Sequence, residues 1–68
     1  MVDTSKLRGI IVANDTTQEA VAKQIGMTPK TFYQKMKRGI FGSDEIEKMI
    51  KLLNIDDPVS IFFADKVT

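Results

Sequence analysis

Positive side chains are concentrated in the middle of the chain. Overall the sequence is nearly neutral, because ten Lys and Arg residues are balanced by nine Asp and Glu residues. Residues 20–43 nevertheless include no acidic residue, and their cations are Lys23, Lys30, Lys35, Lys37 and Arg38. A local positive potential of this kind attracts a polyanion even when the whole molecule is close to neutral. The charge pattern therefore favours a nucleic acid as the binding partner.

Side chains suited to covalent or metal chemistry are scarce. The 68 residues include no Cys and no His, which excludes disulfides, thiolate and imidazole metal ligands and the usual pairs of nucleophile and base. The acidic candidates, Asp56, Asp57 and the group Asp44, Glu45 and Glu47, are explained more simply as helix caps and solvent-facing charge. We expect a protein that is not an enzyme and has no metal or cofactor.

Apolar residues are too dispersed for a membrane segment. The longest uninterrupted apolar runs have four residues, as from Ile10 to Ala13, far fewer than a bilayer or a signal sequence requires. We therefore expect a soluble, cytoplasmic protein without a membrane partner. A chain of 68 residues forms one domain at most, over residues 1–68, with a small core.

The spacing of apolar and capping residues divides the chain into about five short helices, which predicts an all-α fold. The first helix is expected from about Thr4 to Ala13. A second is expected over about 18–25, capped by Thr16 or Thr17, and Thr17 is preferred. It ends at Gly26, because glycine readily adopts the left-handed conformation that is common after helices.

The next helix is marked at both ends. Thr28 is a suitable N-cap and Pro29 fits the first helical position, so a helix is predicted over about 29–38, ending at Gly39. About three residues would separate it from the second helix.

Two further helices complete the predicted fold. Ser43 is expected to cap the fourth, where Asp44 and Glu45 favour the positive end of the helix dipole. This helix is predicted to be buried through a broad apolar face that comprises Ile46, Met49, Ile50, Leu52 and Leu53. Asp57 is expected to cap a short fifth helix, with Pro58 at its first position and one or two turns over 59–64, and the last few residues are expected to fray.

Two helices joined by a short turn that contains glycine match the helix-turn-helix, here over about 17–38, whose second helix enters the DNA major groove. Only Phe32 and Met36 form a core stripe on that second helix, so we expect it to protrude. The side chains expected to point outward are Pro29, Lys30, Thr31, Tyr33, Gln34 and Lys37. They suit bases and phosphates, although short helix corners also occur in bundles that bind no DNA, and Tyr33 could instead lie at the edge of the core.

The segment from Thr17 to Thr28, TQEAVAKQIGMT, resembles the start of the Cro/repressor-type helix-turn-helix domain of phages. Residues 32–36, Phe41, residues 44–46 and the closing PVSIFF of residues 58–63 are similar to small phage-type regulators of Gram-positive bacteria and their mobile elements. The resemblance covers most of the chain. It implies a compact five-helix, lambda-repressor-like domain that represses transcription in a bacterial host cell, usually as a dimer on a palindromic operator.

By position, the resemblance implies roles for individual side chains. Ala22 would pack between the second and third helices, and Gly26 would form the turn. Base edges would face Thr28, Pro29, Lys30, Thr31 and Gln34, where Lys30 suits guanine, Gln34 suits adenine and Thr31 could equally hold phosphate. Phosphates would be contacted by Gln18, Tyr33, Lys35, Lys37, Arg38 and Ser43, and by backbone N–H groups of the 39–43 loop.

Two positions depart from the pattern of this family. Pro29 stands where many members have a base-reading glutamine, so that contact would be lost or become apolar. Lys35 occupies a position that is commonly apolar, and Met36 takes the core role. This exchange could rotate the helix and change which side chains reach the bases.

Phe62 and Phe63 are adjacent, so a helix cannot bury both in one narrow stripe. We expect one ring to cover the core and the other to be exposed. A single module buries only about 600–1,000 Å² on DNA, so we also expect a homodimer, at least on DNA, through the fifth helix and the tail. The sequence thus favours a repressor that binds double-stranded DNA. The alternative is a protein-binding module on the same fold, such as an antitoxin or an antirepressor partner.

Overall fold

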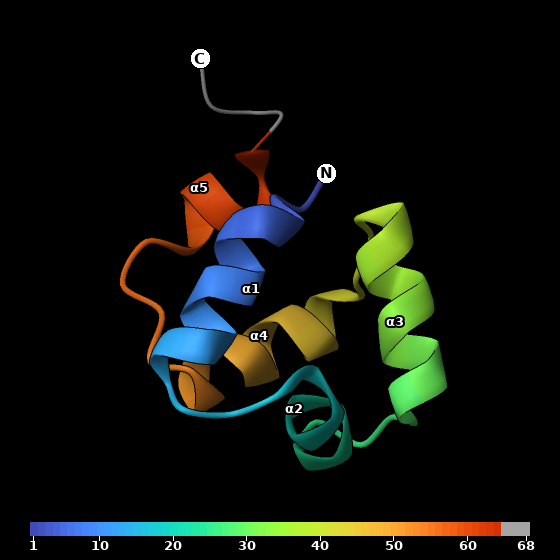
Figure 1. Ribbon diagram of the computed structural model, residues 1–68. Helices are drawn as coiled ribbons and strands as arrows, with labels where there is room; N and C mark the ends of the chain where they lie inside the picture. Colours follow the sequence, from blue (N-terminus) through green and yellow to red (C-terminus); the bar gives the residue numbers. More distant parts are fainter. Residues whose placement is uncertain (65–68) are drawn as a thin grey trace.

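Five helices make up the fold, and the predicted all-α class is confirmed. The computed structural model describes residues 1–64. Its helices are α1 (Thr4–Ala13), α2 (Gln18–Gln24), α3 (Pro29–Arg38), α4 (Ser43–Leu52) and α5 (Pro58–Phe62). The expected fraying of the last residues, and any part of residues 65–68 in a dimer, lie outside the described residues. In Figure 1, α4 passes through the middle of the molecule and α3 stands along one edge.

Side-chain caps explain where four of these helices begin. An oxygen of each N-cap side chain accepts a hydrogen bond from the backbone N–H three residues later, which satisfies a donor that the helix itself leaves open. These pairs are Asp3 with Lys6, Thr17 with Ala20, Thr28 with Thr31 and Asp57 with Ser60. The preference for Thr17 over Thr16 as the cap of α2 is confirmed.

The start of α4 differs from the prediction. Gly42, not Ser43, is its N-cap, and Ser43 is the first helical residue. The reason is a contact in the reverse direction, because the backbone N–H of Gly42 donates a hydrogen bond of 2.7 Å to Oε1 of Glu45. This bond holds the carboxylate of Glu45 against Gly42, so α4 begins one residue earlier than predicted.

Backbone conformation marks the turns on either side of α3. Gly26 has φ of 85° and Gly39 has φ of 71°, both in the left-handed region that favours glycine. The N–H of Met27 bonds to the carbonyl of Ala22, and the N–H of Gly39 bonds to the carbonyl of Lys35. Both turns therefore close in the way expected for helix C-termini.

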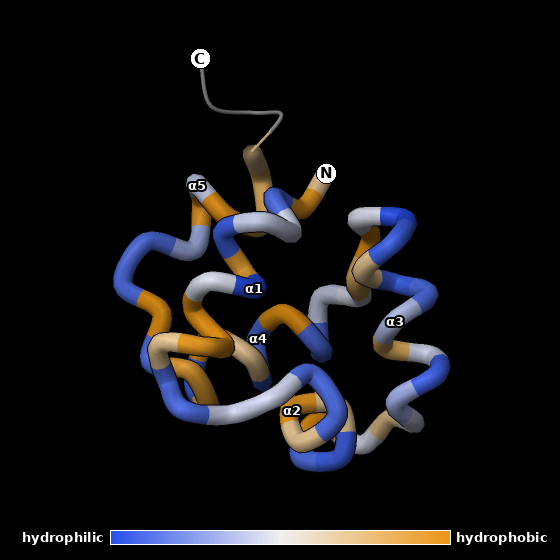
Figure 2. Tube along the Cα trace, viewed as in Figure 1, coloured by the Kyte–Doolittle hydropathy of each residue, from blue (hydrophilic) through white to orange (hydrophobic). Residues whose placement is uncertain are grey.

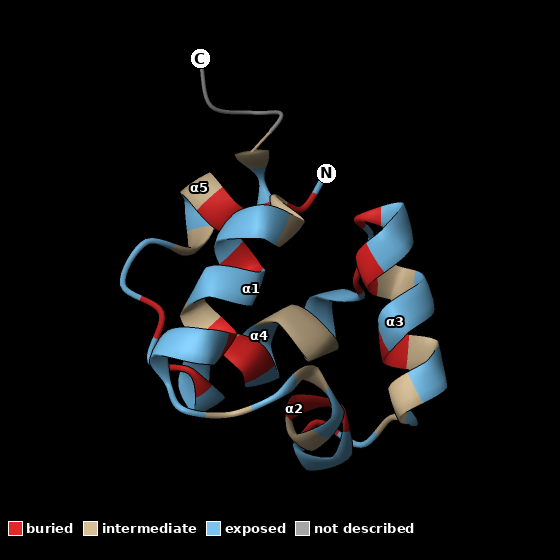
Figure 3. Cartoon of the chain, in the orientation of Figure 1, coloured by how far each residue is buried: buried red, intermediate tan, exposed pale blue. Residues whose placement is uncertain are grey.

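A single apolar cluster fills the space between the helices (Figure 3). Its most completely buried large side chains are Leu7, Ile11, Val21, Phe32 and Met49. Phe62 is buried and Phe63 is 47% exposed, so the expected division between the two rings is confirmed. No helix within residues 1–64 has the length and apolar composition to cross a bilayer.

The apolar face of α4 is less buried than predicted. Met49 is buried, as is Leu53, the residue directly after the helix. Ile46 and Ile50 are half-buried, and Leu52 is 37% exposed. Leu52 and Leu53 are consecutive, and successive helical side chains point about 100° apart, so both cannot face the same core. The broad face predicted for α4 is therefore a narrower buried stripe.

The N-terminal segment connects α3 to α5. The N–H of Val2 donates to the carbonyl of Gly39, with 2.8 Å between nitrogen and oxygen, and the N–H of Asp3 donates to the carbonyl of Ile61 at 2.6 Å. Val2 is also part of the core cluster. These contacts hold the C-terminal end of α3 against the body of the protein.

Candidate nucleic-acid interface

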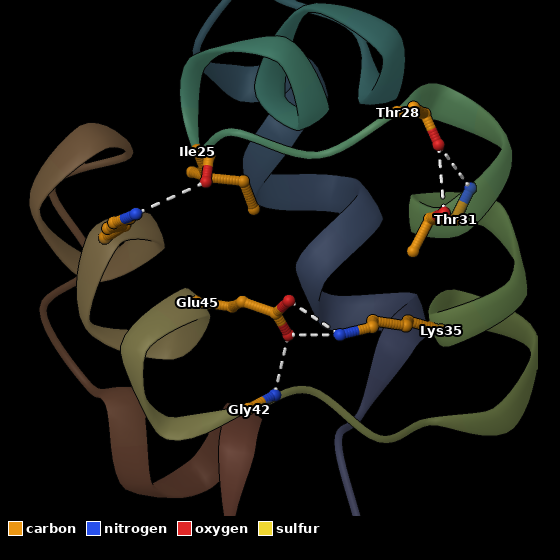
Figure 4. A network of polar contacts seen from close by, with 7 residues as sticks. Ile25, Thr28, Thr31, Lys35, Gly42 and Glu45 are labelled. Atoms are coloured by element: carbon orange, nitrogen blue, oxygen red, sulfur yellow. Dashed lines mark hydrogen bonds and ion pairs between the residues drawn. The ribbon is translucent and has the colours of Figure 1, made fainter.

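The unit formed by α2 and α3 is built around a four-residue turn, residues 25–28. In Figure 1, α2 is seen nearly end-on while α3 runs lengthwise, so the two axes cross steeply. Val21 and Ala22 of α2 are completely buried. Lys48 of α4 also reaches the turn, with its Nζ 3.5 Å from the carbonyl oxygen of Ile25 (Figure 4). The bounds of α3 agree with the predicted 29–38, whereas α2 ends at Gln24, one residue before the predicted end.

One face of α3 is buried and the rest is not. Phe32 and Met36 are buried, as their spacing predicts. Figure 2 shows hydrophilic residues along most of the remaining length. Five of the predicted contact residues on α3 are exposed: Lys30, Tyr33, Gln34, Lys37 and Arg38. Residues three and four apart on a helix are neighbours, so Lys30, Gln34 and Lys37 follow one another along this face.

Pro29 and Thr31, at the start of α3, are half-buried. The exposed Thr28 is occupied as a cap, because its Oγ1 accepts a hydrogen bond from the N–H of Thr31 at 3.3 Å. The hydroxyl of Thr28 also donates a hydrogen bond of 2.9 Å to Oγ1 of Thr31 (Figure 4). The two hydroxyls thus form a local pair that the sequence-based assignment of Thr28 and Thr31 to base edges did not include. Thr28 is the N-cap and Thr31 is the third helical residue. This spacing is the sequence signal from which the pair could have been predicted.

Charge on α3 is not distributed as the sequence alone suggests. Within residues 1–64, no acidic side chain forms an ion pair with Lys30, Lys37 or Arg38. Lys23 on α2 pairs with Glu19 at 3.3 Å, but both side chains are largely exposed, so this pair has little energetic weight. The unpaired positive charge of the acid-free segment therefore lies on α3.

Lys35 has a different environment from the other cations. Its Nζ lies 2.7 Å and 2.6 Å from the two carboxylate oxygens of Glu45 on α4 (Figure 4). The two side chains are only 33% and 22% exposed. Burial alone would raise the pKa of Glu45, but the hydrogen bonds from Lys35 and Gly42, with the charges of Lys35 and Lys48, lower it overall.

The loop between α3 and α4 has fewer free amides than expected. The N–H groups of Gly39 and Ile40 bond to the carbonyl of Lys35, and that of Gly42 bonds to Glu45. Within the described chain, the N–H groups of Phe41 and Ser43 have no acceptor. The expectation that the whole 39–43 loop offers its amides to phosphate was too broad, and Phe41 and Ser43 are the loop residues that retain a free donor.

Gln18 and Phe63 belong to parts of the chain other than α3. Gln18 is half-buried at the first position of α2, and its side chain has no hydrogen bond within residues 1–64. Phe63 lines a shallow apolar recess together with Gly39, Ile40 and Phe41, the residues that directly follow α3. No group of three or more acidic side chains in the described residues could hold a metal ion.

Comparison of the chain with protein-family models, with curated proteins and with solved structures finds no match in any of the three. The likeness to Cro/repressor-type domains therefore remains a resemblance carried by the residues quoted above.

Proposed function

We propose that this protein binds double-stranded DNA in a sequence-specific manner and acts as a transcriptional repressor of the Cro kind, with α3 in the major groove. The observation that carries the proposal is that three cations on the exposed face of α3, Lys30, Lys37 and Arg38, have no acidic partner among residues 1–64. A helix with this charge and exposure is suited to a polyanion, because it loses no internal ion pair on binding.

The dimensions of α3 support this role. A helix of ten residues is about 15 Å long, and the major groove of about 12 Å in width admits one α-helix. Base edges would be read from its first two turns. Lys30 would donate to guanine and Gln34 would bond adenine, while Pro29 would make an apolar contact and Thr31, with its hydroxyl paired to Thr28, would bind a base or a phosphate.

Backbone contacts would surround this central face. Lys37 and Arg38 lie about two turns beyond Lys30, and Tyr33, which lies between them in sequence, is 48% exposed. Gln18 and the free N–H of Ser43 would contribute from α2 and from the start of α4. Such contacts supply affinity and register but little sequence information.

A homodimer on DNA is part of the proposal. The exposed ring of Phe63 and the exposed side chain of Ile40 border the apolar recess. These two side chains would form the interface of the dimer. Two copies would present two α3 helices to half-sites about 34 Å apart, as a palindromic operator requires. Sedimentation of the free protein and of the operator complex measures this directly, and one copy per operator at saturation would count against it.

The alternative, a protein-binding module, rests on the same exposed apolar side chains, Ile40 and Phe63. Salt separates the two functions. DNA binding releases counterions and weakens steeply as salt rises, whereas binding of an apolar protein surface does not.

The decisive experiment is selection of bound sites from random duplexes, followed by titration of the selected duplex and a scrambled one over a range of salt concentrations. We expect a two-fold symmetric site and a steep loss of affinity with salt. The control is a variant with Lys30, Lys37 and Arg38 all changed to Gln, which should lose binding to both duplexes while its circular dichroism spectrum stays helical. Failure of the wild-type protein to enrich any duplex would refute the proposal.

A further inference from the structure

Lys35 and Glu45 connect the exposed helix to the body of the protein. Lys35 lies on α3 between the buried residues Phe32 and Met36, and its ammonium contacts both carboxylate oxygens of Glu45 in the first turn of α4 (Figure 4). Both side chains are mostly covered, so water screens the pair less than an exposed ion pair. The contact spans ten residues of sequence and joins two helices.

The same two residues organise the loop between α3 and α4. The carbonyl oxygen of Lys35 accepts hydrogen bonds from the N–H groups of Gly39 and Ile40. The carboxylate of Glu45, besides binding Lys35, accepts the N–H of Gly42 at 2.7 Å. One continuous network therefore holds the end of α3, both sides of the loop and the start of α4.

The face that α3 presents depends on its rotation about its own axis. Phe32 and Met36 alone form a narrow contact stripe, which permits some rolling of the helix on the core. A bidentate ion pair to α4 on the flank of that stripe removes this freedom, because rolling would separate the ammonium from one or both carboxylate oxygens.

We propose that Glu45 is a positioning residue for DNA binding, which holds Lys35 and Gly42 so that Lys30, Gln34 and Lys37 face the groove. The inference rests on the proposed function. In this role the ammonium of Lys35 forms an ion pair with the carboxylate of Glu45 and makes no phosphate contact. The family resemblance, in contrast, implies a phosphate contact for Lys35.

The sign of one substitution distinguishes positioning from simple electrostatics. Glu45 is an acidic residue close to a surface that binds a polyanion, so by charge alone its neutralisation should tighten DNA binding. If Glu45 positions α3, Glu45→Gln instead weakens binding of the selected operator, by about three- to tenfold. The salt dependence stays unchanged, because no phosphate contact is removed.

The test compares four proteins with the wild type on the selected operator, at several salt concentrations and at a temperature where circular dichroism shows each to be folded. They are Glu45→Gln, Lys35→Met, the charge exchange Lys35→Glu with Glu45→Lys, and the control Glu47→Gln. Glu47 is an exposed acid on the same helix, and among the residues that the structure describes its one ion pair is with Lys51. We expect weaker binding with an unchanged salt slope for both single variants, partial recovery for the exchange, and unchanged or slightly tighter binding for Glu47→Gln.

Lys35→Met keeps an apolar side chain on the flank of the core, so we expect it to fold. It therefore tests the same ion pair if Glu45→Gln proves to be unfolded. Tighter operator binding by Glu45→Gln, or a salt slope that falls by about one unit in Lys35→Met, overturns the positioning role, the latter because Lys35 would then contact phosphate directly. Both outcomes are seen only with a wild-type protein that binds DNA. A wild type that binds no duplex overturns the proposed function, and the positioning role with it.

Discussion

The ring of Phe32 lies against the ring of Phe41, with centroids 5.3 Å apart and planes tilted by 57°. This contact joins the middle of α3 to the loop that follows it, and both rings are buried. Tilted aromatic pairs at this separation are more stable than their buried area alone accounts for. The exposed face of α3 is therefore supported from behind by an aromatic contact within its own helix-loop segment.

Phe32→Ala should be the most destabilising single change in α3. Phe32 is completely buried, so its truncation leaves a cavity and removes the contact with Phe41, at a cost of about 3–5 kcal/mol. Phe32→Leu keeps most of the volume and should cost about 1.5 kcal/mol or less. Urea unfolding measures both. Tyr33→Ala, next along the chain and half exposed, is the control, and a loss as large as that of Phe32→Ala would refute the assigned faces of α3.

Gly26→Ala should destabilise the turn between α2 and α3 by about 1–2 kcal/mol. A Cβ at residue 26 would meet no atom within 4 Å, so the cost comes only from the positive φ of 85°. Gly9→Ala is the matched control, since its Cβ also meets nothing but its backbone is helical, and it should stabilise the protein by about 0.5–1 kcal/mol. Thermal unfolding of both variants should therefore shift in opposite directions, and shifts of the same sign would contradict the turn geometry.

Thr28→Asp should separate helix capping from DNA binding. Aspartate caps helices as well as threonine and suits the positive end of the helix dipole, so stability should change by less than about 0.5 kcal/mol. The added negative charge at the start of α3 should weaken binding to all duplexes several-fold. Thr28→Ala should do the reverse, with loss of the cap costing about 1 kcal/mol and only a small change in affinity. Equal DNA affinity for Thr28→Asp and wild type would argue against α3 as the contacting helix.

Lys37→Ala and Gln34→Ala should have different effects on DNA binding. Lys37 has no acidic partner in the described part of the chain, and loss of its phosphate contact should weaken binding to every sequence and reduce the salt slope by about one unit. Gln34→Ala, and likewise Lys30→Ala, should relax preference at one or two base pairs, with little change in the slope. Competition between operator and scrambled duplexes measures both. If Gln34→Ala kept the full wild-type preference, Gln34 would not be a base-reading residue.

Acid should weaken the contact between α3 and α4. The pKa of Glu45 is lower in the folded protein than in the unfolded chain, so the unfolded state takes up the proton more readily. The stabilisation is complete above the unfolded pKa and is lost as the pH falls through the folded pKa. The difference in unfolding free energy between wild type and Glu45→Gln should therefore shrink as the pH falls below the ordinary glutamate pKa of 4.5 and through the lower pKa of the folded state. Growth of that difference on acidification would contradict the ion pair with Lys35.

Three of the helix starts were predictable from sequence because their causes are local. The caps Thr17, Thr28 and Asp57 each bond to an amide three residues away, so a short stretch of sequence includes both partners. The buried stripe of Phe32 and Met36 was likewise predictable, since one helical turn relates the two positions.

Only the tertiary structure decided the environment of Lys35. Read as one of five cations, it is a candidate for phosphate, but the fold places Glu45 beside it from ten residues away. The same carboxylate accepts the N–H of Gly42, so Gly42 and not the predicted Ser43 is the N-cap of α4. Packing also decided that Phe62 rather than Phe63 is buried, and that Leu52 faces outward. Local sequence determines where a helix begins and which stripe is apolar, because those depend on neighbours within one turn. Which charges remain unpaired depends on how helices pack together, and that is set by contacts between distant parts of the chain.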